Sequence, residues 1–244
     1  MDDGEKQLTK KEKRQLAREQ RMQEENLKKK GSTVARFFWW GVGIVLIVAG
    51  FWYLKSLTET PATSLAIAAP GQKIEHDNVT GATESAKLLV EYSDLQCPAC
   101  AAYHPIVKQL LSEHGNEFTF IYRHFPLRQI HKNAQLAGQA AEAAAKQGKF
   151  WEMQDKLFTN QKDWAEKGNA EEFFVDYAEE FGLNTDQFKT DLHSQDAKDK
   201  VNADYASGIQ ARISSTPTFF LNGEKVDMTS VKSYEDFKNK ILSQ

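Results

Sequence analysis

The stretch VEYSDLQCPACAAYHP, residues 90–105, contains both cysteines of this 244-residue chain and constrains its fold more than any other feature. Two cysteines are too few for a scaffold built from disulfides, so the chain must fold around an apolar core. The apolar run Ala86–Tyr92 comes directly before them and predicts a short buried strand. Pro98 suits the first turn of a helix, where its missing N–H needs no partner. We therefore predict a strand, a turn that carries Cys97, and a helix.

A second strand and a helical segment follow. Residues 117–125 (EFTFIYRHF) have the alternation of a strand, and the pattern changes to helices from about 130 to 206. In this segment aromatic residues recur at helical spacing, as at Phe173, Tyr177 and Phe181. Such a stripe is typical of a helix face that packs into a core rather than of a ligand site.

The last 30 residues carry signals for a hairpin and a final helix. Asn222-Gly223 stands between two strand-like runs and predicts a tight hairpin turn. Ser233 and Asp236 are spaced like the residues that begin a helix. The predicted order is strand, helix, strand, helical insertion, hairpin and helix, which is an α/β fold.

Near the N-terminus, the 18 residues FFWWGVGIVLIVAGFWYL, residues 37–54, contain no charge. As a helix they would rise about 27 Å, close to the roughly 30 Å of a bilayer's hydrocarbon core. Aromatic residues crowd both ends, as at the two membrane interfaces. We therefore predict a single transmembrane helix before the folded domain.

Charge near this segment predicts its orientation. Lys28, Lys29, Lys30 and Arg36 precede it, whereas Lys55 is the nearby cation after it, so the N-terminus is expected in the cytoplasm. A cleavable signal peptide is disfavoured because the apolar run is longer than a usual signal core. We expect retention as a signal-anchor in the cell membrane, with the C-terminal domain on the extracytoplasmic side.

These boundaries divide the chain into four parts. We expect a charged cytoplasmic tail at 1–36, the membrane span at 37–54, a linker at 55–73 and the folded domain at 74–244. The tail has 11 Lys and Arg against 7 Asp and Glu, and the rest of the chain has 20 against 27. An acidic main body argues against nucleic acid as a partner.

The two cysteines allow three interpretations. As a structural disulfide they would close a loop of two residues, which removes little entropy from the unfolded chain. As a metal site, Cys97, Cys100 and His104 have ligand-like spacing, but a closed zinc site needs four ligands, so we expect no metal. As a pair for thiol-disulfide exchange, Cys97 lies at a helix N-terminus, where backbone N–H groups and the helix dipole stabilise a thiolate. Cys97 would then be the exposed nucleophile and Cys100 the less accessible resolving thiol.

The residues VEYSDLQCPAC, Pro105 and SSTPTFFLNG, with the helical stretch HKNAQLAGQAAEAAAKQGKFWEMQDKLF, resemble the DsbA-like branch of the thioredoxin superfamily. The resemblance runs from about Ile74 to Leu242. It implies a thioredoxin-like fold with a helical insertion, and a redox-active disulfide in place of any cofactor.

The resemblance also implies roles for individual residues. Pro217 should be a cis-proline beside the reactive pair, and the backbone of Thr216 should pair with an extended substrate peptide. Glu91 matches a buried acid that relays a proton to Cys100, although a strand-end charge in solvent or in an ion pair would explain it equally well. Ala99 departs from the His of the most oxidising members. We therefore expect a Cys97 pKa below ~8.5 but above ~3.5.

The function that the resemblance implies is a membrane-anchored thiol-disulfide oxidoreductase. We expect an oxidase that introduces disulfides into unfolded secreted proteins and is reoxidised by a membrane partner of the DsbB or vitamin-K-epoxide-reductase type. A disulfide isomerase or reductase remains an alternative. A metallochaperone that uses Cys97, Cys100 and His104, or an adhesion module in which the cysteines are a passive clip, are alternatives from other classes.

Overall fold

The computed structural model describes residues 18, 21–22, 39–50 and 67–243 of a chain that divides into two units, 1–62 and 63–244. In the first unit, residues 39–50 form a helix. Both ends of the predicted membrane span at 37–54 lie outside the described residues, as do most of the predicted tail and residues 55–66 of the linker. Within the described ranges, no helix combines the length and the apolar character needed to cross a bilayer.

The described part of the second unit contains a five-stranded sheet in the order β1–β3–β2–β4–β5. The strands are β1 (Asn78–Gly81), β2 (Leu88–Ser93), β3 (Thr119–His124), β4 (Thr218–Leu221) and β5 (Glu224–Lys225). β2 and β3 are parallel, and the other pairs are antiparallel. The two strands predicted first are therefore confirmed, and the structure makes them neighbours in the sheet. The strand β1 was not predicted.

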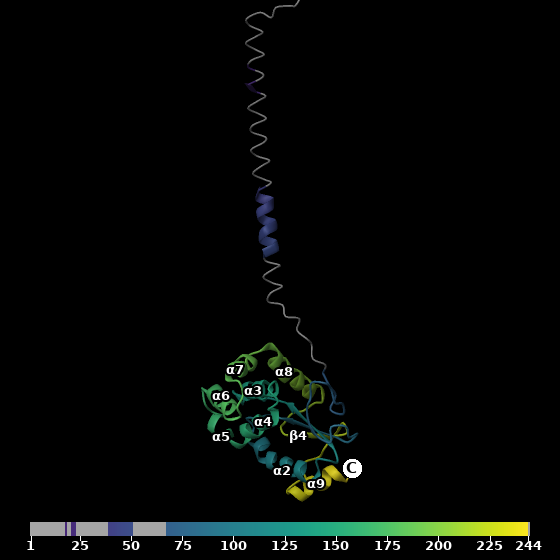
Figure 1. Ribbon diagram of the computed structural model, residues 1–244. Coiled ribbons are helices and arrows are strands. Elements are labelled where there is room, and N and C mark those ends of the chain that lie inside the picture. Colours follow the sequence, from purple (N-terminus) through teal and green to yellow (C-terminus); the bar gives the residue numbers. More distant parts are fainter. Residues whose placement is uncertain (1–17, 19–20, 23–38, 51–66, 244) are drawn as a thin grey trace, which may run out of the picture. The chain divides into compact units, whose positions relative to one another are not determined.

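Helices account for most of the remaining chain. α2 (Pro98–His114) follows β2, and α9 (Tyr234–Leu242) ends the domain beside it (Figure 1). The predicted helical insertion lies between β3 and β4. Its helices are α3 (Ala134–Ala145), α4 (Phe150–Thr159), α5 (Gln161–Trp164), α6 (Ala170–Glu180), α7 (Thr185–Leu192) and α8 (Gln195–Gln210). The domain thus has a thioredoxin-like α/β fold with a helical insertion.

The central strands are covered on both faces, because alternate side chains enter two separate apolar clusters. On the first face, Leu89, Tyr122 and Phe219 pack with residues of α2, α9 and the insertion. On the second face, Val90 and Phe220 belong to a smaller cluster. The continuous apolar run before the cysteines follows from this double burial.

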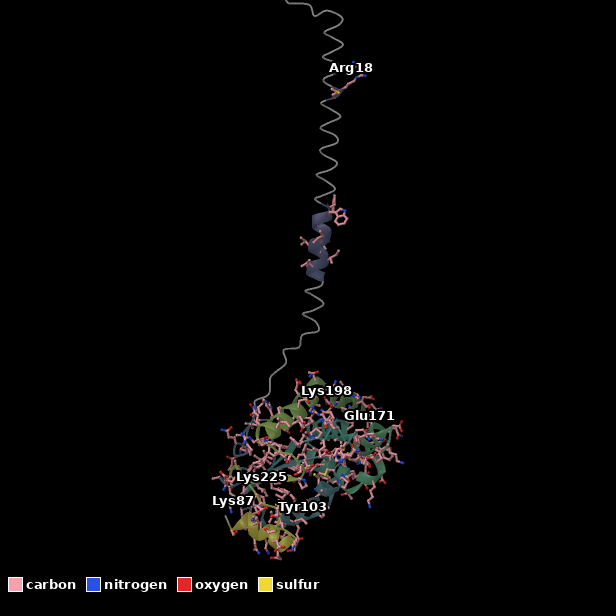
Figure 2. The ribbon with its side chains drawn as sticks, turned by 180° about the vertical axis from the view of Figure 1, so that it is seen from behind. Arg18, Lys87, Tyr103, Glu171, Lys198 and Lys225 are labelled. Carbon is pink, nitrogen blue, oxygen red and sulfur yellow. The ribbon has the colours of Figure 1, made fainter. Side chains whose placement is uncertain are left out.

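Contacts at α9 and at the hairpin fix the C-terminal part of the domain (Figure 2). Lys87, just before β2, donates from Nζ to the carbonyl oxygens of Ile241 and Leu242 at 3.4 and 3.2 Å. Asn222 and Gly223 have φ of 51° and 88°, as a hairpin turn of this kind requires, so the predicted hairpin is confirmed. The predicted start of the last helix is also confirmed, since Ser233 accepts a hydrogen bond from Asp236 N.

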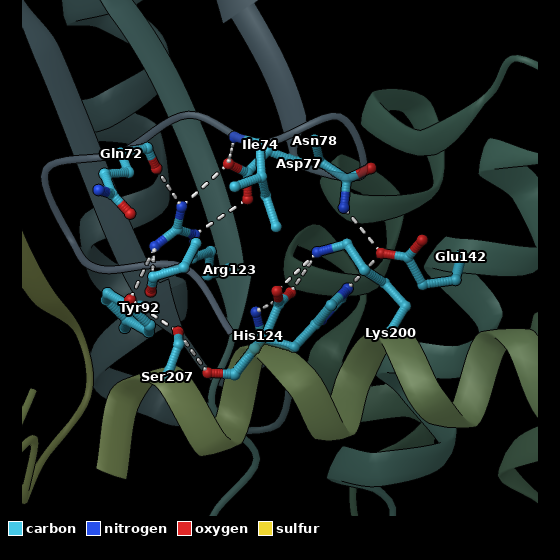
Figure 3. Close-up of polar contacts among 12 residues, drawn as sticks. Gln72, Ile74, Asp77, Asn78, Tyr92, Arg123, His124, Glu142, Lys200 and Ser207 are labelled. Carbon is cyan, nitrogen blue, oxygen red and sulfur yellow. Dashed lines mark hydrogen bonds and ion pairs between the residues drawn. The ribbon is translucent and has the colours of Figure 1, made fainter. Parts of the chain in front are cut away.

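A group of buried charges joins the N-terminal segment of the domain to the sheet (Figure 3). We call it the charged network, and its members are Asp77, Arg123, His124, Glu142, Lys200 and Asp204. The two Arg123–Asp77 hydrogen bonds both measure 2.9 Å, and the two between Lys200 Nζ and Asp204 measure 2.6 and 2.7 Å. His124 Nε2 lies 2.9 Å from Glu142 Oε1. Each buried charge in this network therefore has a partner of opposite sign or a hydrogen bond.

Candidate active site

The turn between β2 and α2 places Cys97 at the start of the helix. Cys97 N donates to Asp94 O at 3.0 Å, which closes the turn. Cys97 is the N-cap residue, with extended backbone angles of φ −74° and ψ 123°, and Pro98 follows at the first helical position. Because proline has no N–H and a φ suited to a helix, it begins α2 without loss of a hydrogen bond. The structure therefore bears out the predicted strand, turn and helix.

The two thiols differ in their access to solvent. Cys97 is 7% exposed and Cys100 is 0% exposed, whereas Pro98 and Ala99 between them are exposed. Both are free thiols in the structure. Cys97 is the more accessible of the two, as predicted, but it is less exposed than expected. The Thr216 carbonyl oxygen lies 3.7 Å from Cys97 Sγ and accepts a hydrogen bond from it.

The two thiols also differ in acidity. The Cys100 side chain and the backbone N–H groups of Cys100 and Ala99 lower the pKa of Cys97 to about 5, against the effect of burial. This value lies within the range predicted for a pair with Ala99 in place of a histidine. Burial raises the pKa of Cys100 well above its ordinary value, and the Cys97 thiolate raises it further. The thiolate form is therefore favoured at Cys97, and the protonated thiol is favoured at Cys100.

The loop before β4 lies beside the pair. The Thr216–Pro217 peptide bond is cis, as the resemblance implied. A hollow of about 520 Å³ adjoins this loop, and its lining includes Ser215, Pro217, Thr218, Val226, Asp227 and Met228. Thr216 contacts the reactive sulfur, and Pro217, the next residue, lines this hollow. The two residues predicted to bind substrate are thus brought to the reactive cysteine.

Glu91 is buried on the first face of the sheet, so the strand-end position in solvent is excluded. Its exposed fraction is 3%, and in the strand register it faces Tyr122 of β3 and Phe219 of β4. Burial raises the pKa of Glu91 to about 7, and the Ser93 hydroxyl opposes this rise. Among the described residues no cation pairs with it. An ion pair, the other alternative, is therefore not what the structure contains.

Two buried hydroxyl groups lie near Glu91 and Cys100. Tyr122 faces Glu91 in the strand register, and burial raises its pKa, with the charges of Glu91 and Cys100 raising it further. Within the described part of the chain, Ser93 Oγ and Tyr122 Oη make no hydrogen bond of ordinary geometry, but the Ser93 hydroxyl lies close enough to Glu91, Cys100 and Tyr122 to lower the pKa of each. We call Glu91, Ser93, Tyr122 and Cys100 the acid cluster. In it the Ser93 hydroxyl lies between a titratable carboxyl group and the buried thiol.

His104 contacts residues of the helical insertion. Its Nε2 lies 2.8 Å from Asp155 Oδ1, and its ring stacks against Phe158 at a centroid distance of 4.8 Å. In the ranges that the structure describes, no three side chains of His, Cys, Asp or Glu are arranged to hold a metal ion. The geometry therefore gives no support to a metallochaperone that uses Cys97, Cys100 and His104.

Several residues that surround the turn were not predicted from the sequence. Four of them are buried or half-buried and form hydrogen bonds with each other or with backbone groups near Cys97: Asp94, Gln96, His131 and Gln161. Asp94 lies within the quoted motif and could have been singled out there. Gln96 lies in the same motif, directly before Cys97. Nothing local marks His131 and Gln161, because they reach the turn from the helical insertion.

The sequence is similar to a known protein family and to one part of a longer protein. The thioredoxin family matches residues 73–241. A Na⁺/H⁺ antiporter, NhaA 3 of Salinispora tropica, is 36% identical over 151 residues, which are 62% of this chain. The aligned part spans only 22% of that antiporter's length. The similarity therefore concerns one portion of a much longer protein.

Solved structures with the same fold agree with this result. BdbD from Bacillus subtilis superposes with a TM-score of 0.61 at 22% identity and covers 72% of this chain and 97% of its own. MdbA of Corynebacterium diphtheriae, a thiol-disulfide oxidoreductase, gives a TM-score of 0.55 at 19% identity and covers 75% of this chain and 100% of its own. At these identities the likeness establishes the fold.

Proposed function

The chain belongs to the thioredoxin family, and on this premise we propose that it is a thiol-disulfide oxidoreductase acting through a redox-active disulfide between Cys97 and Cys100. The observation that carries the proposal is the unequal pair of thiols, one with a lowered pKa at a helix start and one buried with a raised pKa. A thiolate that is stable near neutral pH is a good leaving group. This favours transfer of the disulfide from the enzyme to a substrate, so we propose an oxidase.

The oxidising cycle moves two electrons from the substrate to the enzyme pair. A substrate thiolate attacks Cys97 Sγ, the Cys97–Cys100 bond breaks, and Cys100 leaves as a thiolate that takes up a proton. A second substrate thiolate attacks the substrate sulfur of the mixed disulfide, and Cys97 leaves as a thiolate. The substrate loses two electrons and gains a disulfide, and the enzyme pair is reduced to the dithiol.

Glu91 is proposed as the proton carrier for Cys100. Its pKa of about 7 means that both of its protonation states are populated near neutral pH, which suits a group that gives and receives a proton. Its place in the acid cluster, beside the fully buried Cys100, supports this role. Water has little access to that sulfur, so an internal donor would be needed.

Thr216 and Pro217 are proposed to bind the substrate chain. The hollow beside Pro217 and the position of the Thr216 carbonyl against Cys97 Sγ support an extended peptide laid along this loop. Backbone hydrogen bonds of this kind read no side chain, so the substrates would be unfolded secreted proteins of many sequences.

The cellular setting is also proposed. The uncharged run at 37–54 and the cations before it support a single-pass membrane protein with a cytoplasmic N-terminus and an extracytoplasmic catalytic domain. In that setting the reduced pair would be reoxidised by a membrane partner of the DsbB or vitamin-K-epoxide-reductase type, as the family resemblance implies.

A refolding assay tests the activity. The oxidised full chain is mixed with a reduced, unfolded disulfide protein, and disulfide formation is followed over time. We expect acceleration by the wild-type chain, none by Cys97→Ser, and a trapped mixed disulfide with Cys100→Ala. A passive clip would give no acceleration, and that result would overturn the proposal.

Alkylation of the cysteines in living cells then tests the direction. An oxidase is expected to be mostly oxidised at Cys97 and Cys100, because it waits for substrates in its disulfide form. A mostly reduced pair would overturn the oxidase assignment in favour of an isomerase or reductase.

A further inference from the structure

The residues just before Cys97 are bound on several sides by the helical insertion. Asp94, buried at the end of β2, accepts hydrogen bonds from Leu127 N at 2.8 Å and from His131 Nδ1 at 2.7 Å. Its other carboxylate oxygen accepts from Gln96 N at 2.7 Å. The Gln96 side chain in turn accepts from Asn133 N at 2.7 Å. The turn is therefore fixed to the segment that leads into α3.

Gln161, the first residue of α5, makes the contact nearest to the reactive sulfur. Its Nε2 donates to the carbonyl oxygen of Leu95 at 2.8 Å and to that of Cys97 at 3.1 Å. The residue is 8% exposed, so water does not compete for these carbonyl groups. Gln161 comes more than 60 residues after the turn in the sequence and is the point where the insertion touches the nucleophile's own backbone.

The Cys97 carbonyl has a second partner that makes this contact important. It accepts the first hydrogen bond of α2, from Ala101 N at 3.1 Å, while Gln161 occupies its other side. Together the two donors fix the direction of the Cys97 carbonyl group and so the ψ angle of Cys97. This angle decides whether Sγ lies within reach of the N–H groups of Ala99 and Cys100, which stabilise the thiolate.

We propose that Gln161 is a positioning residue for Cys97, through which the helical insertion holds the thiolate against the N-terminus of α2. The inference rests on the proposed thiol-disulfide chemistry and assigns part of its reactivity to a side chain outside the thioredoxin core. The positive end of the Gln161 amide dipole also lies at the Cys97 residue and adds to the stabilisation of the thiolate. A purely structural role would be to satisfy two buried carbonyl groups and nothing more.

Gln161→Leu separates the two roles, because leucine nearly conserves volume and has no donor. In the full chain, the thiolate absorbance of Cys97 is titrated with pH, and the equilibrium of the pair with glutathione is measured. We expect the titration midpoint to rise by about one pH unit. The equilibrium constant for reduction of the pair should fall about tenfold, equivalent to about 30 mV.

Gln139→Leu is the matched control. Gln139 is 5% exposed and donates from Nε2 to Leu192 O at 2.8 Å, so the substitution removes a similar buried hydrogen bond away from Cys97. We expect a loss of stability as in Gln161→Leu but no change in the titration. Gln161→Glu should raise the midpoint at least as far as leucine does, because it replaces a donor with a negative charge, and it provides the readout if the leucine variant does not fold.

An unchanged midpoint and glutathione equilibrium in both Gln161 variants would overturn the inference and leave Gln161 a structural residue. The titration and the glutathione equilibrium need no protein substrate. Failure of the proposed oxidase activity would therefore appear in the refolding assay alone and would be distinguishable.

Discussion

The sheet buries carboxylates in two different ways. In the charged network, Asp77 is paired with Arg123, and Asp204 is paired with Lys200, all of them almost inaccessible to water. In the acid cluster, Glu91 is equally buried, but no described cation pairs with it and its pKa rises to about 7. The two regions lie within one domain and meet on the strand β3.

The difference separates buried charges that stabilise the fold from a buried carboxyl group that can gain and lose its proton. A cation beside a buried carboxylate favours its ionised form, although burial still raises the pKa of Asp204 against the charge of Lys200. A buried carboxyl group without a cation keeps its proton until the pH approaches neutrality. A group of the second kind costs stability when it ionises and is suited to proton transfer.

The largest effect is expected from Arg123→Met in the charged network. The substitution leaves the buried Asp77 carboxylate without its cation and should lower the free energy of unfolding by about 3 to 5 kcal/mol. Urea denaturation measures it. Arg128→Met is the control, since Arg128 lies over the Tyr205 ring at the surface and should cost less than about 1 kcal/mol. Equal losses of unfolding free energy in the two variants would show that the charged network does not stabilise the fold more than a surface contact does.

The next effect is a pH dependence that differs in sign between the regions. With a folded pKa of about 7 against an ordinary 4.5, Glu91 binds more protons in the folded protein between these values. Its contribution to stability therefore falls as the pH rises through that window, by about 3 kcal/mol in total. The stability of reduced Glu91→Gln relative to wild type should rise by this amount from pH 4 to pH 8, as measured by urea denaturation at each pH.

Glu142→Gln provides the opposite sign in the same experiment. Burial raises the pKa of Glu142, but hydrogen bonds from His124 and Asn78 and the charge of Lys200 outweigh it and lower the pKa. Its contribution is therefore present above the ordinary pKa of the group and is lost as the pH falls below it. Parallel pH profiles for the two variants would show that the distinction between the regions is wrong.

A kinetic effect of similar size is expected at Cys100. Without the Glu91 carboxyl group, proton transfer at the buried thiol has no internal carrier, so Glu91→Gln should slow turnover of the mixed disulfide about 100-fold. Quenched-flow trapping of the mixed disulfide with a model peptide measures its lifetime. Glu152→Gln, on the exposed side of α4, is the control and should leave the lifetime unchanged. A normal lifetime in Glu91→Gln would exclude the proton-carrier role.

The smallest effect is expected from charges that belong to neither region. Lys149→Gln breaks a pair with Glu152 whose two members are both about 40% exposed. Solvent screens such a pair, so the free energy of unfolding should change by less than about 0.5 kcal/mol. Thermal denaturation at low and high salt measures it. A larger loss would mean that exposure is a poor guide to which charges support the fold.

Local patterns in the sequence predicted the elements around the cysteines and the hairpin well, because strand length, proline position and Asn-Gly turns are local properties. On α6 the expected stripe of Phe173, Tyr177 and Phe181 does pack against the first apolar cluster. Phe174, which was not predicted, is the fully buried phenylalanine of this helix, and Phe173 is half-buried. Adjacent phenylalanines satisfy two helical phases, and only tertiary contacts choose between them.

Longer-range features of the site could not be predicted. The burial of Glu91 was undecided because a strand covered on both faces has no alternation that shows where a side chain points. The contact of Gln161 with the Cys97 carbonyl joins residues 64 positions apart, and a glutamine in a helix of four residues carries no signal of it. The strand β1 (Asn78–Gly81) was missed because its side chains are mostly polar or small and only half-buried.

The hold of Arg123 on the segment before β1 has a mechanical consequence. Its guanidinium group binds the carbonyl oxygens of Ala68, Ala69 and Gln72 at 3.3, 3.0 and 2.6 Å. A pull on the chain at residue 67 therefore acts first on the side chain of Arg123, which belongs to the interior strand β3. Without these hydrogen bonds the pull would act on the edge strand β1 and separate it from the sheet. Several hydrogen bonds of Arg123 share the force, so a pull from that end would strain them before it disturbed the cysteine pair.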